Sequence, residues 1–99
     1  RKAVALDPRH APAQFAAGNC AMVAQDHEAA FMHFQQALQA SPNFTDARRN
    51  LAILYIVRGD YDAAIEQLTL ALRFDPHNAQ IRADLDRARR ERADAGNDN

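Results

Sequence analysis

Four histidines are the side chains of this sequence with the most obvious capacity to bind a metal ion. His27 and His33 are six positions apart, so they would not closely share one face of a helix. His10 and His77 each follow a proline closely and are interpreted as turn residues. No cysteine or carboxylate completes a group with the spacing of metal ligands. We therefore expect solvent-exposed histidines and predict neither a metal site nor a cofactor.

Catalytic groups are equally hard to assemble from this sequence. Cys20 is the single cysteine, and no serine, histidine and aspartate are spaced so that a helix would bring them together. There is no glycine-rich loop of the kind that holds phosphate groups. The acidic pairs Asp60/Asp62 and Asp84/Asp86 are two positions apart and would not face each other on a helix. The sequence therefore predicts a protein that is not an enzyme.

The charge balance limits the classes of partner. The 99 residues include 12 Lys or Arg and 13 Asp or Glu, for a formal net charge of −1. A nearly neutral chain is not expected to bind nucleic acid through its phosphates or a membrane through a basic patch. No apolar run approaches the roughly 20 residues of a membrane span. The lack of a signal peptide and of a disulfide favours the cytoplasm over secretion, and a first residue other than Met fits a fragment or a processed chain.

The stretch 59–76 shows most clearly a pattern that recurs along the sequence. It reads as an amphipathic helix with a turn at each end, and its closing Asp75-Pro76 recurs as Ser41-Pro42 and Asp7-Pro8, at a period of 34 residues. A fixed period of this length is typical of helical repeat proteins. Apolar residues at helical spacing, together with the proline stops, predict helices over 11–24, 27–40, 45–58, 61–74 and 79–93.

The turns inside the two full periods differ in one residue. Asp26 and Asp60 are predicted N-caps of the helices that follow them. Gly59 suits the left-handed position that ends the helix over 45–58, whereas Gln25 stands at the same position one period earlier. Because a non-glycine residue costs roughly 1 kcal/mol in the left-handed region, we expect the first period to be the less stable one.

The last predicted helix, 79–93, is of another kind. Ile81, Leu85 and Ala88 form one narrow apolar line, and most other positions are charged. Its arginines invite an RNA-binding interpretation, but residues 79–99 contain five Arg, five acidic residues and no aromatic residue. We therefore expect a solvated helix that closes the end of the fold, followed by a frayed tail over 94–99.

The order helix, tight turn, helix and proline at a 34-residue period resembles the tetratricopeptide repeat family. The resemblance is carried in 45–78 by Leu51, Ala52, Tyr55, Gly59, Ala64, Leu68, Ala71 and Pro76, and in 11–44 by Gly18, Ala30, Phe34, Ala37 and Pro42. It implies an all-α fold, an α-solenoid of antiparallel helix pairs in a right-handed superhelix. It also divides the chain into a remnant of a preceding repeat at 1–10, repeats at 11–44 and 45–78, a capping helix at 79–93 and a tail at 94–99. Cys20 then falls at a position that is small and buried in the family, so we expect a core thiol.

In this family the first helix of each repeat lines a concave groove that binds a partner peptide or helix. The resemblance places Val23 and Val57 among the residues of this groove. From that set we single out the predicted partner-binding residues Phe15, Asn19, Met22, Arg49, Asn50, Ile53, Ile56 and Arg87. Relatives that bind chaperone tails use three cations, which are replaced here by Phe15, Gln80 and Asp84, so no such binding is expected.

The predicted function is a protein–protein interaction scaffold, a segment of a longer repeat protein whose partner is a protein or peptide. The concave groove that the resemblance implies is the predicted binding site. Two alternatives stay open. One is a homo-oligomerisation module, in which the open N-terminal end forms a homodimer. The other is a non-catalytic accessory domain of a larger enzyme.

Overall fold

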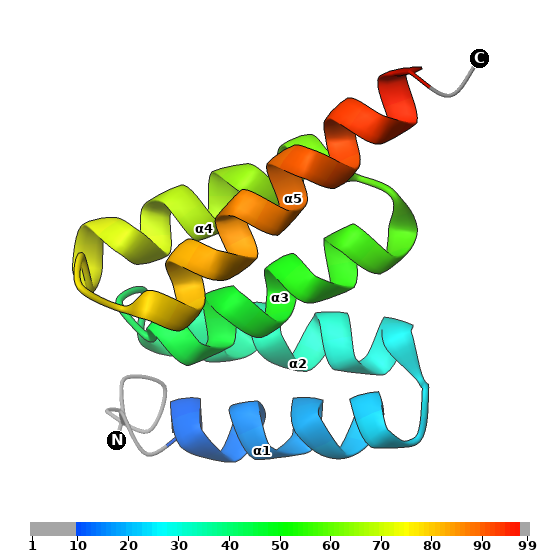
Figure 1. Cartoon of the computed structure of the whole chain (residues 1–99). Coiled ribbons are helices and arrows are strands. Elements are labelled where there is room, and N and C mark those ends of the chain that lie inside the picture. The colour runs from blue at the N-terminus through cyan, green and yellow to red at the C-terminus, as the bar shows by residue number, and fades with distance from the viewer. Residues whose placement is uncertain (1–9, 98–99) are drawn as a thin grey trace.

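The computed structural model describes residues 10–97, and these form five α-helices and no strand (Figure 1). The helices are α1 (His10–Val23), α2 (His27–Ala40), α3 (Thr45–Arg58), α4 (Tyr61–Phe74) and α5 (Ala79–Asn97). The predicted all-α fold is confirmed. Helices α2, α3 and α4 begin and end where the sequence predicts, and both ends of α1 lie one residue earlier than predicted.

The two ends of the chain depart from the predicted division. The prediction that a frayed tail begins at residue 94 is wrong, because α5 continues to Asn97. No proline follows residue 93, and Ala93 and Ala95 are strong helix formers, so nothing local stops the helix at the predicted place. The predicted remnant at 1–10 lies outside the described residues except for His10, which begins α1.

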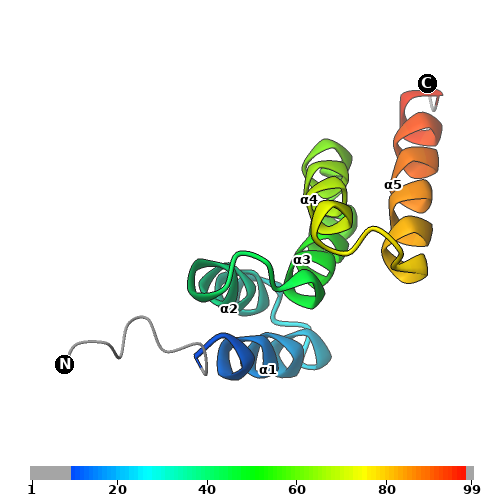
Figure 2. The same cartoon turned by 90° about the vertical axis from the view of Figure 1, so that its left-hand side faces the viewer.

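The helices form two layers (Figure 2). Helices α1, α3 and α5 lie in one layer, here called the first-helix layer, and α2 and α4 lie in the other, the second-helix layer. Tight turns make α1 and α2 one antiparallel pair and α3 and α4 another (Figure 1). Helix α3 packs on both α2 and α4, and α5 packs on α4. Each new first helix therefore rests on the second helix of the pair before it.

The turns inside the two pairs share an aspartate cap and differ in the left-handed residue. Asp26 Oδ1 and Asp60 Oδ1 each accept a hydrogen bond from the backbone N–H three residues further on, at 3.2 and 3.4 Å. Gly59 has a φ of 82° and Gln25 a φ of 61°. The left-handed position predicted for both turns is confirmed, with a glutamine side chain in the first of them.

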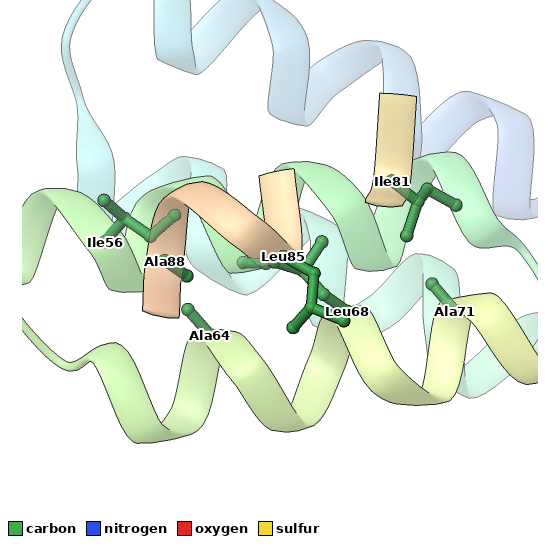
Figure 3. Close-up of a cluster of buried hydrophobic side chains, with 8 residues drawn as sticks. Ile56, Ala64, Leu68, Ala71, Ile81, Leu85 and Ala88 are labelled. Atoms are coloured by element: carbon green, nitrogen blue, oxygen red, sulfur yellow. The ribbon is translucent and has the colours of Figure 1, made fainter. Parts of the chain in front are cut away.

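Two buried clusters join successive helices, and they use positions one period apart. The cluster between α2 and α3 contains Ala30, Phe34, Leu51 and Leu54. The equivalent residues of α4 and α5 are Ala64, Leu68, Leu85 and Ala88, and they are joined by Ala52, Ile56, Ala71 and Ile81 (Figure 3). Because equivalent positions are buried at both junctions, the 34-residue period of the sequence is also the period of the packing.

The outer side of α5 is not covered by a second helix in the described part of the chain. In α3, Ala52 belongs to the buried cluster with α4, and Tyr55 packs against that cluster. The equivalent positions of α5 carry Asp86 and Arg89, which are both exposed. The buried side chains of α5 are the line predicted from the sequence, Ile81, Leu85 and Ala88. A helix that is apolar on one line and charged elsewhere suits the end of a stack.

Candidate partner-binding surface

All eight residues predicted to bind a partner lie in the first-helix layer. Helix α1 carries three of them, α3 carries four and α5 carries Arg87. Ile56 is buried, Arg87 is exposed and the other six are half-buried. A buried side chain offers no apolar surface to a partner without rearrangement, and a half-buried one offers only part of its surface.

Ile56 is not available to a partner. Its exposed fraction is 6%, and it lies in the cluster with Ala64 and Leu68 of α4 (Figure 3). The prediction is wrong for this residue because successive residues of a helix are turned by about 100°, so Ile56 enters the core while its neighbour Val57 stays exposed.

Phe15 and Met22 are half-buried and contribute mainly to the core. The ring centroid of Phe15 lies 5.9 Å from that of Phe34 and 5.0 Å from that of Phe44. Met22 packs against the cluster between α2 and α3. Both side chains therefore present an edge, rather than their full apolar surface, to anything outside.

The polar residues are held by neighbouring first helices. Asn50 Nδ2 donates a hydrogen bond to Asn19 Oδ1 at 2.8 Å, which joins α3 to α1. Arg49 Nε donates to the Asp84 carboxylate, and Arg49 Nη1 donates to Gln80 Oε1 at 3.4 Å, so Arg49 joins α3 to α5. Polar contacts thus link all three helices of the layer, and Asp84 balances the charge of Arg49.

The most exposed large apolar residues of this layer are two valines. Val23 of α1 is 87% exposed and Val57 of α3 is 59% exposed, while Ile53 is half-buried. Val23 and Val57 occupy equivalent positions one period apart. The family resemblance placed both on the groove, but sequence reasoning favoured the larger Ile56. We call Val23, Ile53 and Val57, with the amides of Asn19 and Asn50, the first-helix face.

Arg87 lies on α5, at the edge of the same layer, and is exposed. Its Nε donates a hydrogen bond to Glu91 Oε2 at 2.8 Å. This hydrogen bond and the charge of Glu91 raise the pKa of Arg87 above its ordinary value. The pair of Arg87 with Glu91 is a surface contact worth a few tenths of a kcal/mol.

Cys20 is exposed, contrary to the expectation of a core thiol. The equivalent residues Leu54 and Ala88 are buried, because each faces the second helix of the pair before it. Within residues 10–97 no helix precedes α1, so the corresponding side of α1 faces solvent. Burial at this position depends on a neighbouring helix and not on the residue itself.

The histidines do not assemble into a site. His10, His27 and His77 are exposed, and His33 is half-buried with its Nδ1 2.8 Å from Gln14 Oε1. In the region that the structure describes, no three His, Cys, Asp or Glu residues are placed to hold a metal ion. None of the described helices is long and apolar enough to span a membrane.

The pairing of the helices and the 34-residue packing period agree with a family model for the tetratricopeptide repeat, which matches residues 21–88. This chain belongs to the tetratricopeptide repeat family. The family recognised from the sequence is therefore confirmed. Tetratricopeptide repeats stack into solenoids that are generally protein-interaction scaffolds and not catalysts.

A solved structure supports the same fold. The crystal structure of MamA protein superimposes with a TM-score of 0.80 at 24% sequence identity, over 95% of this chain and 53% of that chain. The chain thus spans about half the length of MamA. The comparison with curated proteins finds no match.

Proposed function

We propose that this chain is a protein-interaction scaffold that binds a peptide or helix of a partner protein on the first-helix face. The observation that carries the proposal is the exposure of Val23 and Val57, beside Ile53 and two amide side chains. Apolar side chains interspersed with a few polar groups are typical of protein interfaces. The polar links between α1, α3 and α5 favour a preformed surface, which lowers the entropic cost of binding.

The apolar and the polar residues of the first-helix face have different roles in binding the partner. Apolar side chains of the partner lose contact with water against Val23, Ile53 and Val57, which supplies affinity. The hydrogen bond between Asn50 and Asn19 uses one group of each amide. The amino group of Asn19 and the side-chain oxygen of Asn50 then orient the partner's polar groups. Arg49 and Asp84 act as a neutral pair beside them.

The test uses a ligand selected from a library of displayed peptides against the immobilised chain. In Ile53→Asp combined with Val57→Asp, we expect the affinity for that ligand to fall by more than about tenfold, because two anchors are replaced by charges. Ile56 is left unchanged, since a carboxylate there would be buried in the core.

The matched control is Met32→Asp, a substitution of another exposed apolar residue, 53% exposed, on α2 of the second-helix layer. We expect this variant to bind the ligand as the unmodified chain does. Equal affinities for all three proteins would place the binding site outside the first-helix face. Circular dichroism of each variant checks that the helices are retained.

A second candidate function is homo-oligomerisation through α1. Ala13 and Cys20 are exposed and Ala17 is half-buried, although the equivalent residues of α3 and α5 are all buried. This small apolar surface favours contact with another helix. Sedimentation over a range of concentrations tests the candidate: an Ala17→Arg variant should stay monomeric where the unmodified chain associates, and a monomer at every concentration in both proteins would remove it.

A further inference from the structure

A cavity of about 350 Å³ lies between α2, α3 and α4. Helices α2 and α4 form the second-helix layer, and α3 packs against both (Figure 2). Residues of all three helices line this cavity, here called the second-helix groove, and none of them belongs to the first-helix face. A second cavity of about 570 Å³ adjoins it through the shared residue Gln35.

The single charge in the lining of the groove is Arg48, and neutral groups hold it in place. Its Nε donates to the backbone oxygen of Pro42 at 3.2 Å, and its Nη1 donates to Gln67 Oε1 at 2.8 Å. Its guanidinium carbon lies 5.9 Å from the ring centroid of Phe74. These contacts use two of the five N–H donors of the guanidinium, which leaves the others for a ligand.

Arg48 differs in this respect from the arginines of the molecule that form ion pairs. Arg49, Arg87 and Arg92 each lie within 4.0 Å of a carboxylate. Among residues 10–97, no carboxylate lies within that distance of Arg48, although its side chain is half-buried. A guanidinium that is held in one position without a counter-ion is suited to bind an anion from outside through charge-assisted hydrogen bonds.

The remaining lining of the groove is suited to a polypeptide. Leu38, Leu51 and Tyr55 supply apolar surface. Amide side chains surround it, from Gln35, Gln39 and Gln67. Amides both donate and accept hydrogen bonds, as the peptide backbone does. An extended segment leaves its backbone N–H and C=O groups free to bond with these amides, whereas a helix pairs them internally. The lining therefore favours an extended segment.

We propose that the second-helix groove binds an extended segment of a partner protein in which an acidic and an aliphatic residue are two positions apart. Side chains at i and i+2 of an extended chain point to the same side. The carboxylate therefore binds Arg48 while the aliphatic side chain lies against Leu38. The groove and the first-helix face are separate surfaces, so a single scaffold can hold two partners at once.

The first experiment titrates the isotope-labelled chain with a peptide of sequence Gly-Ser-Glu-Ser-Leu-Ser-Gly, blocked at both ends, and follows backbone amide resonances. We expect resonances of Gln39, Leu51 and Gln67 to shift and those of Asn19 and Asn50 to stay in place. Replacing the peptide's glutamate by glutamine should weaken binding by about tenfold, since a charge-assisted pair is lost. The absence of shifts in the groove, or equal binding of the two peptides, would overturn the proposal.

The second experiment changes the chain. Arg48→Gln should abolish the preference for the glutamate peptide over the glutamine peptide. The matched control is Arg89→Gln, which removes an exposed arginine from α5 and should leave the preference intact. A preference that survives in Arg48→Gln would contradict the assignment. If this variant loses its helices, the two peptides compared on the unmodified chain still decide the matter.

Discussion

In the first helix pair Gly18 faces the ring of Phe34, whereas in the second pair the same two positions carry Ala52 and Leu68. A Cβ atom added to Gly18 would lie 2.5 to 2.9 Å from atoms of the Phe34 ring. Ala52 and Leu68 are both fully buried in one cluster. Gly18, which is smaller than Ala52, therefore contacts Phe34, which is larger than Leu68. What repeats between the two pairs is the filled volume at this contact, not the residue types.

The largest expected effect comes from emptying the contact in the first pair. Phe34→Ala should lower the free energy of unfolding by about 3–5 kcal/mol, since a fully buried aromatic ring is lost. Leu68→Ala should cost about 2–5 kcal/mol at the equivalent place. Urea unfolding followed by circular dichroism measures both. Phe74→Ala is the control: this ring is 51% exposed, and a loss within about 1 kcal/mol is expected.

Exchanging residue sizes between the pairs should have the next largest effect. Gly18→Ala should destabilise by about 1–3 kcal/mol, because the new methyl group meets the Phe34 ring. Combining it with Phe34→Leu reproduces the second pair and should recover most of that loss. Ala16→Gly, at an exposed position in the interior of α1, is a reference for backbone propensity alone, at about 1 kcal/mol. Simply additive costs in the double variant would show that the two positions are not coupled.

The turns offer a smaller contrast of the same kind. Gln25→Gly should raise the free energy of unfolding by up to about 1 kcal/mol, because its φ of 61° is strained for a residue with a side chain. That gain corresponds to a melting temperature higher by roughly 4–8 °C. Gly59→Gln should lower stability by a similar amount. An unchanged or lower melting temperature for Gln25→Gly would mean that the glutamine side chain makes contacts worth more than the strain.

The smallest effects concern an arginine at equivalent positions of α3 and α5. The guanidinium carbon of Arg58 lies 4.5 Å from the ring centroid of Phe31, whereas Arg92 Nη1 donates to Asp62 Oδ1 at 2.8 Å. Arg58→Ala should cost about 0.5–1 kcal/mol. Arg92→Ala should cost less than about 0.5 kcal/mol, and that cost should vanish in concentrated salt. Similar salt dependence for both variants would contradict this distinction.

The helix ends could be predicted because their signals are local. Asp26 and Asp60 cap the helices that follow them, and Pro42 and Pro76 stop the helices before them. The end of α5 was missed for the same reason, since no such signal stands near residue 93. Local signals also carry the 34-residue period, and hence the family.

The candidate site was less predictable because burial in a stack is a property of neighbouring helices. Ile56 and Val57 are adjacent aliphatic residues on a helix that packs on two others, so side-chain type does not tell which one enters the core. Cys20 is equivalent to the buried Leu54 and Ala88, but within residues 10–97 no helix covers it. Arg48 and Gln67 are 19 positions apart, and only the packing of α3 on α4 brings them together.

The polar link from α3 to α5 also bears on how quickly the chain folds. The bond between Arg49 and Asp84 spans 35 positions, the longest separation of any side-chain hydrogen bond within residues 10–97. All other side-chain hydrogen bonds within residues 10–97 therefore join residues that are nearer in sequence. Forming contacts between residues that are near in sequence costs little loop-closure entropy. Helical proteins of that type fold within microseconds to milliseconds. We expect the main refolding phase of this chain on that time scale, and temperature-jump relaxation would reveal a slower one.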